Sequence, residues 1–164
     1  MKAKRLTTLS VAVALAMILS FVESQIPPLV AVPGVKIGLS NIVTVFLLYT
    51  FGWRDACAVT TVRVCLSALL FGSAVSLIYS AAGALLSIVG MVLLKKIPIF
   101  STLSVSVAGG VLHNAAQILC AIAIMENAAI ALYLPPLIIS GTLAGVVVGI
   151  AAALLTKKLA RVVR

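Results

Sequence analysis

The sequence is poor in the side chains that most catalytic and metal-binding sites require. Its 164 residues include three carboxylates, Glu23, Asp55 and Glu126, and one histidine, His113. Enzymes that transfer prenyl or phosphoryl groups generally hold Mg²⁺ with clustered carboxylates. A chain with one aspartate and two glutamates cannot build such a cluster easily. We therefore predict a protein that is not an enzyme and has neither a metal site nor a cofactor.

Several sequence motifs of catalysis are also absent. The chain contains no G-x-x-x-x-G-K-[ST] phosphate-binding loop, no G-x-S-x-G and no H-E-x-x-H. It is therefore not expected to hydrolyse nucleotides by itself. The three cysteines, Cys57, Cys65 and Cys120, form no C-x-x-C pair and lie in apolar segments, which favours a packing role.

Charged residues are scarce as well, at 9% of the chain, whereas 63% of the residues are apolar. A soluble domain of this length has too little interior to hide so much apolar surface. The formal charge of +9 comes from basic residues clustered at the ends of apolar runs. This clustering indicates membrane orientation rather than binding to nucleic acid.

The apolar residues fall into six runs separated by polar or proline-containing segments. A helix of about 20 residues crosses the hydrocarbon core of a bilayer. The sequence thus predicts a single all-α membrane domain, a bundle of six transmembrane helices at residues 6–25, 35–51, 55–71, 72–94, 101–125 and 134–156. The first run also resembles a signal peptide, but its length and the five runs that follow favour a retained helix.

The basic residues predict the orientation of these six spans. With a cytoplasmic N-terminus, ten basic residues fall on the cytoplasmic side and only Lys36 falls in an outer loop. The positive-inside rule therefore favours cytoplasmic N and C termini. The ten are Lys2, Lys4, Arg5, Arg54, Lys95, Lys96, Lys157, Lys158, Arg161 and Arg164.

Four polar residues lie at membrane depth, where a charged side chain costs about 2.5–3.5 kcal/mol on insertion scales. Arg63 is near the middle of the third span, and His113, Asn114 and Gln117 are midway along the fifth. These side chains either line a ligand cavity or form hydrogen bonds between helices. For Arg63 both interpretations stay open, and for the group of three we favour the cavity.

Glu23, Lys36 and Asn41 bring acidic, basic and amide groups to the predicted outer mouth of the bundle. They are either further ligand contacts or part of a solvated loop. Two patterns of small residues allow close helix packing. Ala12 and Ala16 lie on the first span, and Gly141, Gly145 and Gly149 lie on the sixth. Internal packing and docking to another membrane subunit are both open for these two patterns.

Taken together, several motifs resemble the Gx transporter family, which is also labelled heptaprenyl diphosphate synthase component I. They are E-S-x-I-P at 23–27, P-G-V-K-x-G-L-x-N at 33–41, Arg63-Val64, S-V-S at 104–106 and H-N-x-x-Q at 113–117. That family is similar to the S components of energy-coupling factor (ECF) vitamin transporters. The resemblance covers the chain from about Leu6 to Thr156.

The resemblance implies a six-helix, S-component-like subunit in the cytoplasmic membrane of a prokaryote. It implies a small-molecule substrate that binds near the outer face, and association with a membrane T component and two cytoplasmic ATPases. In S components an A-x-x-x-A pattern on the first helix meets the T component, and Ala12 and Ala16 fit that pattern. The substrate itself does not carry over; the basic groups suggest an anionic or carbonyl-bearing molecule, such as a flavin, a quinone or an isoprenoid precursor. The alternative is a structural or assembly subunit of a membrane redox or isoprenoid-synthesis complex.

Overall fold

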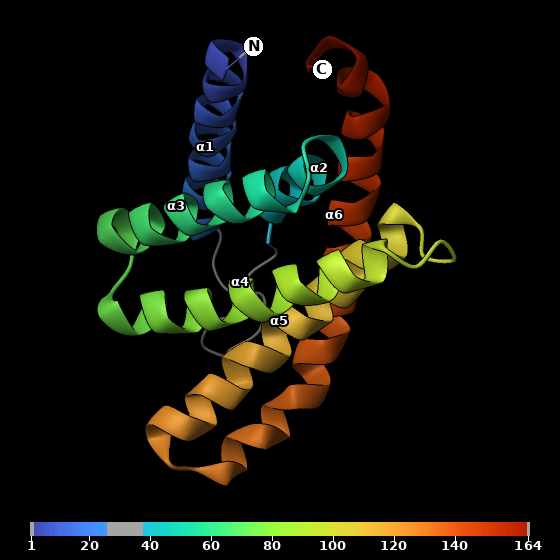
Figure 1. Ribbon diagram of the computed structural model, residues 1–164. Coiled ribbons are helices and arrows are strands. Elements are labelled where there is room, and N and C mark those ends of the chain that lie inside the picture. Colours follow the sequence, from blue (N-terminus) through green and yellow to red (C-terminus); the bar gives the residue numbers. More distant parts are fainter. Residues whose placement is uncertain (1, 26–37, 164) are drawn as a thin grey trace.

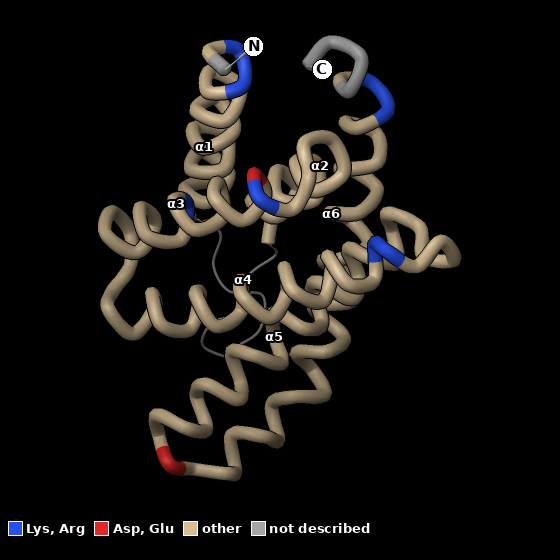
Figure 2. The backbone as a smooth tube through the Cα atoms, viewed as in Figure 1, with Lys and Arg blue, Asp and Glu red and all other residues tan. Residues whose placement is uncertain are grey.

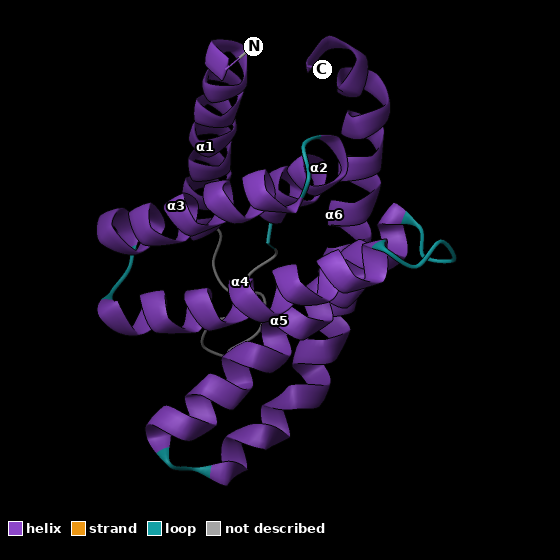
Figure 3. Ribbon diagram, in the orientation of Figure 1, coloured by secondary structure: helices purple, strands orange, loops and turns teal. Residues whose placement is uncertain are grey.

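The computed structural model describes residues 2–25 and 38–163, and every regular element in these ranges is a helix (Figures 1 and 3). The elements are α1 (Lys2–Gln25), α2 (Asn41–Thr50), α3 (Trp53–Phe71), α4 (Ala74–Lys95), α5 (Thr102–Met125), the 3-10 helix η1 (Ala128–Tyr133) and α6 (Leu134–Val163). The start of α1 and the end of α6 lie at one end of the molecule, and the α5–α6 connection lies at the other (Figure 1).

The helix boundaries follow local chemistry. The side chains of Ser73 and Ser101 accept hydrogen bonds from the backbone N–H groups of Ser76 and Ser104, which caps the starts of α4 and α5. Gly52 allows the turn between α2 and α3, because its φ of +107° favours glycine. Between the predicted spans 101–125 and 134–156, residues 128–133 form the 3-10 helix η1.

Four described segments are long and apolar enough to cross a membrane: Ala3–Gln25, Ala74–Lys95, Thr102–Met125 and Ala128–Leu159. Helix α2, with ten residues, is shorter than a spanning helix. Its predicted span began at residue 35, but residues 26–37 lie outside the described part. Helix α3 has 19 residues, but Arg54, Asp55 and Arg63 make it too polar to qualify by composition. The chain is thus a multi-pass membrane protein, and its described part is all-helical.

Helix α2 is the centre of the apolar core. Six of its ten residues are buried, and Val45, Leu47 and Leu48 are almost completely inaccessible. Residues from α1, α5 and α6 pack in the same cluster, among them Ala16 and Ala152. Because α2 is packed on several sides, its position is fixed. The polar residues at its two ends are therefore held in place as well.

The ladder of small residues on α6 brings two backbones together. A Cβ atom on Gly145 would lie 2.6 Å from the Cα atom of Val107, and one on Gly149 would lie 3.1 Å from the Cα atom of Leu103. Gly141 lies equally close to the backbone of Gly110 on α5. Of the two interpretations of the glycine ladder, the structure therefore supports internal packing.

Polar contacts tie several helix ends together. Figure 2 shows basic residues at the start of α1, at the start of α3, at the end of α4 and near the end of α6. Arg5, near the start of α1, forms a bidentate ion pair with Asp55 at the start of α3, with N–O distances of 2.7 and 3.2 Å. Lys95, at the end of α4, donates a 2.5 Å hydrogen bond to the carbonyl of Leu48 and lies 4.8 Å from the centre of the Tyr49 ring. The starts of α1 and α3 and the ends of α2 and α4 are therefore on one side.

Candidate functional site

A small polar cavity lies among α1, α3, α4, α5 and the turn before α2. Its volume is about 70 Å³. Side chains that are far apart in the sequence line it, and five of the predicted ligand-binding residues are among them: Glu23, Asn41, Arg63, His113 and Gln117. Water occupies roughly 30 Å³ per molecule in the liquid, so the cavity accommodates about two waters or one polar group of a ligand.

Glu23, near the end of α1, lines the cavity. Its side chain is only 8% exposed, and its carboxylate accepts a hydrogen bond from the backbone N–H of Gly38. This bond joins the end of α1 to the turn that precedes α2. A buried carboxylate needs such donors or a nearby positive charge.

Arg63 supplies that positive charge from the middle of α3. One guanidinium nitrogen, Nη1, donates a 2.9 Å hydrogen bond to Oγ of Ser40, and the Glu23 carboxylate acts on the guanidinium electrostatically. The Nε atom is buried and has no hydrogen-bond partner among the described residues. Arg63 is thus partly compensated within the protein and keeps a donor that a ligand can satisfy.

His113 and Gln117 complete the opposite wall from α5. They are four residues apart and share one face of the helix. The imidazole packs directly over Gly83 of α4, where a Cβ atom would lie only 2.7 Å from its Cε1 atom. The amide oxygen of Gln117 is buried and, within residues 2–25 and 38–163, accepts no hydrogen bond. Gly83 therefore creates the space for the ring, and the oxygen of Gln117 is an acceptor left unpaired within the described residues.

Asn114 was predicted to share this wall, and the structure places it elsewhere. Its side chain is 5% exposed and lies between α5 and α6. The amide Nδ2 donates to the carbonyl oxygen of Leu137 at 2.7 Å and to Oγ of Ser140 at 3.4 Å. One residue corresponds to about 100° of helix rotation, which turns Asn114 away from His113 and toward α6. Asn114 is an interhelical hydrogen-bonding residue.

Lys36, also predicted to bind the substrate, lies outside the described residues, so its role stays a prediction. Ala12 and Ala16, predicted to dock a partner, are 8% and 1% exposed and belong to the apolar core of this chain. Side chains already buried inside the chain leave no contact area for a second subunit at that position.

Serines are the part of the site that sequence reasoning missed. Six of them line the cavity: Ser20, Ser24, Ser40, Ser67, Ser76 and Ser80. The spacing of Ser20 with Ser24, and of Ser76 with Ser80, places each pair on one helix face. The four-residue spacing was the sequence signal for these serines. Because serine is common in membrane helices, this signal is weaker than that of the charged and amide groups.

The carboxylates do not converge. Glu23 lines the cavity, Asp55 is paired with Arg5, and Glu126 ends α5 in a left-handed conformation. No group of three or more metal-ligating side chains occurs in the part of the chain that the structure describes. The polar cavity therefore offers hydrogen-bonding groups and one pair of opposite charges, Glu23 and Arg63.

The long apolar helices define a multi-pass membrane protein, and the polar cavity lies among them. The chain belongs to the family described as heptaprenyl diphosphate synthase component I, whose model matches residues 12–155. No curated protein and no solved structure matches the chain.

Proposed function

We propose that the chain is the substrate-binding membrane subunit, or S component, of an ECF-type importer in the cytoplasmic membrane of a prokaryote. The substrate is a small vitamin-like molecule, or one related to flavins, quinones or prenyl compounds. The observation that carries this proposal is the convergence of Arg63 with Glu23, Gln117 and six serines on one cavity. Polar side chains from several helices line this cavity together with Arg63, and ionisable residues within membrane segments commonly mark substrate pathways.

The described cavity is smaller than a complete binding site. Sites for small molecules typically enclose about 300–1,000 Å³, whereas this cavity holds about 70 Å³. Binding of a vitamin-sized substrate therefore requires the helices around it to separate. Helix α1 packs mainly on α3, and α4 packs mainly on α5. Movement of the α1–α3 pair away from α4 and α5 would widen the cavity with the smallest loss of packing.

The proposal includes six membrane crossings, two more than the four segments that are long and apolar enough to span on their own. The end of α1 is hydrogen-bonded to Gly38, just before α2, whereas the end of α2 contacts Lys95. Asp55, at the start of α3, is paired with Arg5 at the start of α1. In this proposal the chain is back on the side of the N-terminus by the end of α2, and α3 crosses again. The basic clusters would then lie together on the cytoplasmic side.

A membrane T component and two cytoplasmic ATPases would supply the energy. Because Ala12 and Ala16 are buried, the T component would contact another surface. On α1 the exposed residues Val11, Leu15 and Ile18 form an apolar face that is open for such contact.

A second candidate function is a non-catalytic subunit of an isoprenoid-synthesis or redox complex in the membrane. The description of the family as a synthase component favours it. Affinity purification from the native membrane separates the two candidates. A T component with paired ATPases supports import, whereas a prenyl-transferring enzyme or a reductase supports the second function.

The direct test is to identify what the protein binds. The protein is purified in mild detergent, and small molecules that remain bound are identified by native mass spectrometry. Their dissociation constants are then measured for wild type, Arg63→Ala, Arg63→Lys and Arg54→Ala. We expect Arg63→Ala to weaken binding by about tenfold or more, because a charge-assisted hydrogen bond contributes roughly 1.5–3 kcal/mol.

Two controls sharpen this test. Arg63→Lys keeps the charge, so it should retain part of the affinity if the variant folds. Arg54 is exposed and lies at the start of α3, outside the cavity, so Arg54→Ala should bind like wild type. The proposal fails if wild type binds no small molecule specifically, or if the two alanine variants lose affinity equally.

A further inference from the structure

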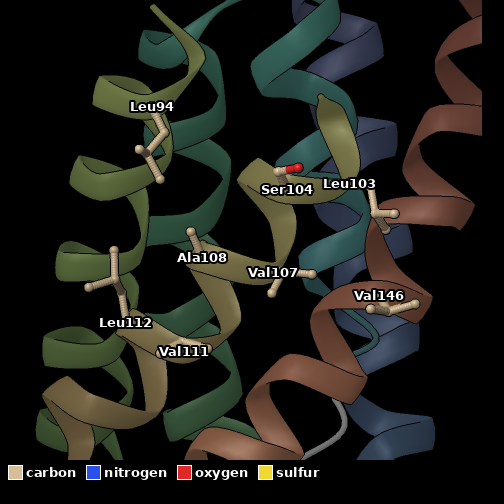
Figure 4. Close-up of a pocket in the computed structure, with 8 residues that line it drawn as sticks. All are labelled: Leu94, Leu103, Ser104, Val107, Ala108, Val111, Leu112 and Val146. Atoms are coloured by element: carbon tan, nitrogen blue, oxygen red, sulfur yellow. The ribbon is translucent and has the colours of Figure 1, made fainter. Parts of the chain in front are cut away.

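A second hollow, independent of the polar cavity, runs along the outer surface of α4, α5 and α6 (Figure 4). It is an open groove of about 600 Å³. We call it the α5 groove. Seven of its eight lining residues are apolar: Leu94, Leu103, Val107, Ala108, Val111, Leu112 and Val146, with Ser104 as the eighth. Ala108, whose side chain is short, forms the floor of the groove and lies between the larger side chains of Leu94 and Leu112 (Figure 4).

The length of the groove matches one leaflet of a bilayer. Along α5 it extends from Leu103 to Leu112, which corresponds to about 14 Å at 1.5 Å per residue. Half of a hydrocarbon core of roughly 30 Å is about 15 Å. Both α4 and α5 are candidate membrane spans, and α5 begins at Thr102. The groove therefore starts at the membrane surface and ends near the bilayer centre, as an acyl chain does.

The surface end of the groove is basic. Leu94 and Leu103 both line the groove, so the chain that joins them, residues 95–102, lies at that end. This connection contains Lys95 and the exposed Lys96. Exposed Ile97, Ile99 and Phe100 follow directly, a composition typical of the boundary between headgroups and acyl chains. Ser104 adds a hydroxyl group at the same end.

From this complementarity we propose that the α5 groove is a binding site for an anionic phospholipid. One acyl chain lies along Val107, Ala108 and Val111, and the phosphate faces Lys96. Lys95 contributes less directly, because its ammonium group is already bonded to the carbonyl of Leu48. This site is separate from the polar cavity and does not depend on the import function.

The test compares lipids bound to the purified full-length protein. Mixed micelles contain equal amounts of phosphatidylglycerol and phosphatidylcholine, and native mass spectrometry counts the lipids retained. We expect wild type to retain phosphatidylglycerol preferentially. Lys96→Gln should lower this preference about fivefold, since a basic residue near a lipid surface contributes about that factor. Lys158→Gln removes another exposed charge, near the end of α6 and away from the groove, and should change the preference little.

Groove variants test where the acyl chain lies. Ala108→Leu fills the floor and should reduce retention of both lipids. If this variant does not fold, Val111→Ser makes the floor polar without adding volume and should have the same effect. Equal retention of the two lipids by wild type would overturn the proposal. So would equal effects of Lys96→Gln and Lys158→Gln, or cross-linking of Ala108→Cys to a protein instead of lipid in native membranes.

Discussion

At the scale of single residues, position on the helix decides whether a polar side chain faces the cavity or a neighbouring helix. His113 and Gln117 line the cavity, whereas Asn114 donates to the carbonyl of Leu137 on α6. All three lie within five residues of α5. Their roles are separated by the helical rotation of about 100° per residue.

This separation leads to a paired prediction for Asn114 and Gln117. Asn114→Ala should lower stability by about 0.6–1.7 kcal/mol, the range for interhelical hydrogen bonds in membranes, and leave substrate affinity unchanged. Gln117→Ala should weaken substrate binding with little effect on stability, because its amide oxygen has no hydrogen-bond partner among the described residues. Thermal unfolding in detergent and ligand titration measure the two quantities. The same pattern in both variants would contradict this assignment.

The sequence predicted which polar residues matter for the site better than it predicted which way their side chains face. Arg63, His113 and Gln117 were predicted because they are polar residues within apolar runs. Such side chains need hydrogen-bond or charge partners inside a membrane. Asn114 was predicted to face the cavity together with His113 and Gln117. The sequence does not show on which side of α5 each neighbouring helix lies, so it could not reveal that Asn114 faces α6. The serines of the cavity were missed, because a hydroxyl group can satisfy itself on its own helix.

At the scale of helices, close backbone contact between α5 and α6 is the feature that a substitution tests best. Gly145→Ala would bring a Cβ atom to within 2.6 Å of the Cα atom of Val107, and a backbone atom cannot rotate away. Overpacking of this kind costs about 1–3 kcal/mol. We expect Gly145→Ala to lower the unfolding temperature measurably in detergent.

Gly90→Ala is the matched control for that substitution. The atom that its Cβ would meet is the end of the flexible Leu112 side chain, which can change rotamer toward the open α5 groove. This variant should unfold close to the wild-type temperature. If the two glycine variants are destabilised equally, the loss arises from the glycine positions in general and not from the α5–α6 contact.

Most helices were predictable, because apolar runs bounded by basic pairs, prolines and serine caps are strong signals. The direction in which small residues face was not. Alanine at four-residue spacing suits an internal contact and an external one equally, and Ala12 and Ala16 proved to be internal. The short α2 was predicted as a full span, because the sequence cannot show that its first turn begins at Asn41.

At the scale of the whole molecule, the number of crossings depends on where the α2–α3 turn lies. With six crossings, Arg54 is on the cytoplasmic side with Lys96. With only the four candidate spans crossing, Arg54 would be on the same side as Glu126. The ion pair between Arg5 and Asp55 favours six, because it holds the start of α3 beside the start of α1.

Cysteine labelling checks this prediction. Single cysteines replace Arg54, Lys96 or Glu126 in a background where Cys57, Cys65 and Cys120 are alanine. A membrane-impermeant maleimide should label positions 54 and 96 only in inverted vesicles, and position 126 only in intact cells. Labelling of position 54 together with position 126 would reduce the crossings to four.

The glycine contact between α5 and α6 also bears on how the protein is made. These helices are neighbours in the sequence, joined by a short 3-10 helix, so their contact needs no distant partner. Contacts between segments close in sequence form quickly. Helices α5 and α6, in the final third of the polypeptide, can therefore assemble as a hairpin as soon as they leave the ribosome. The core around α2 includes residues of both helices, so it forms only after they have been synthesised.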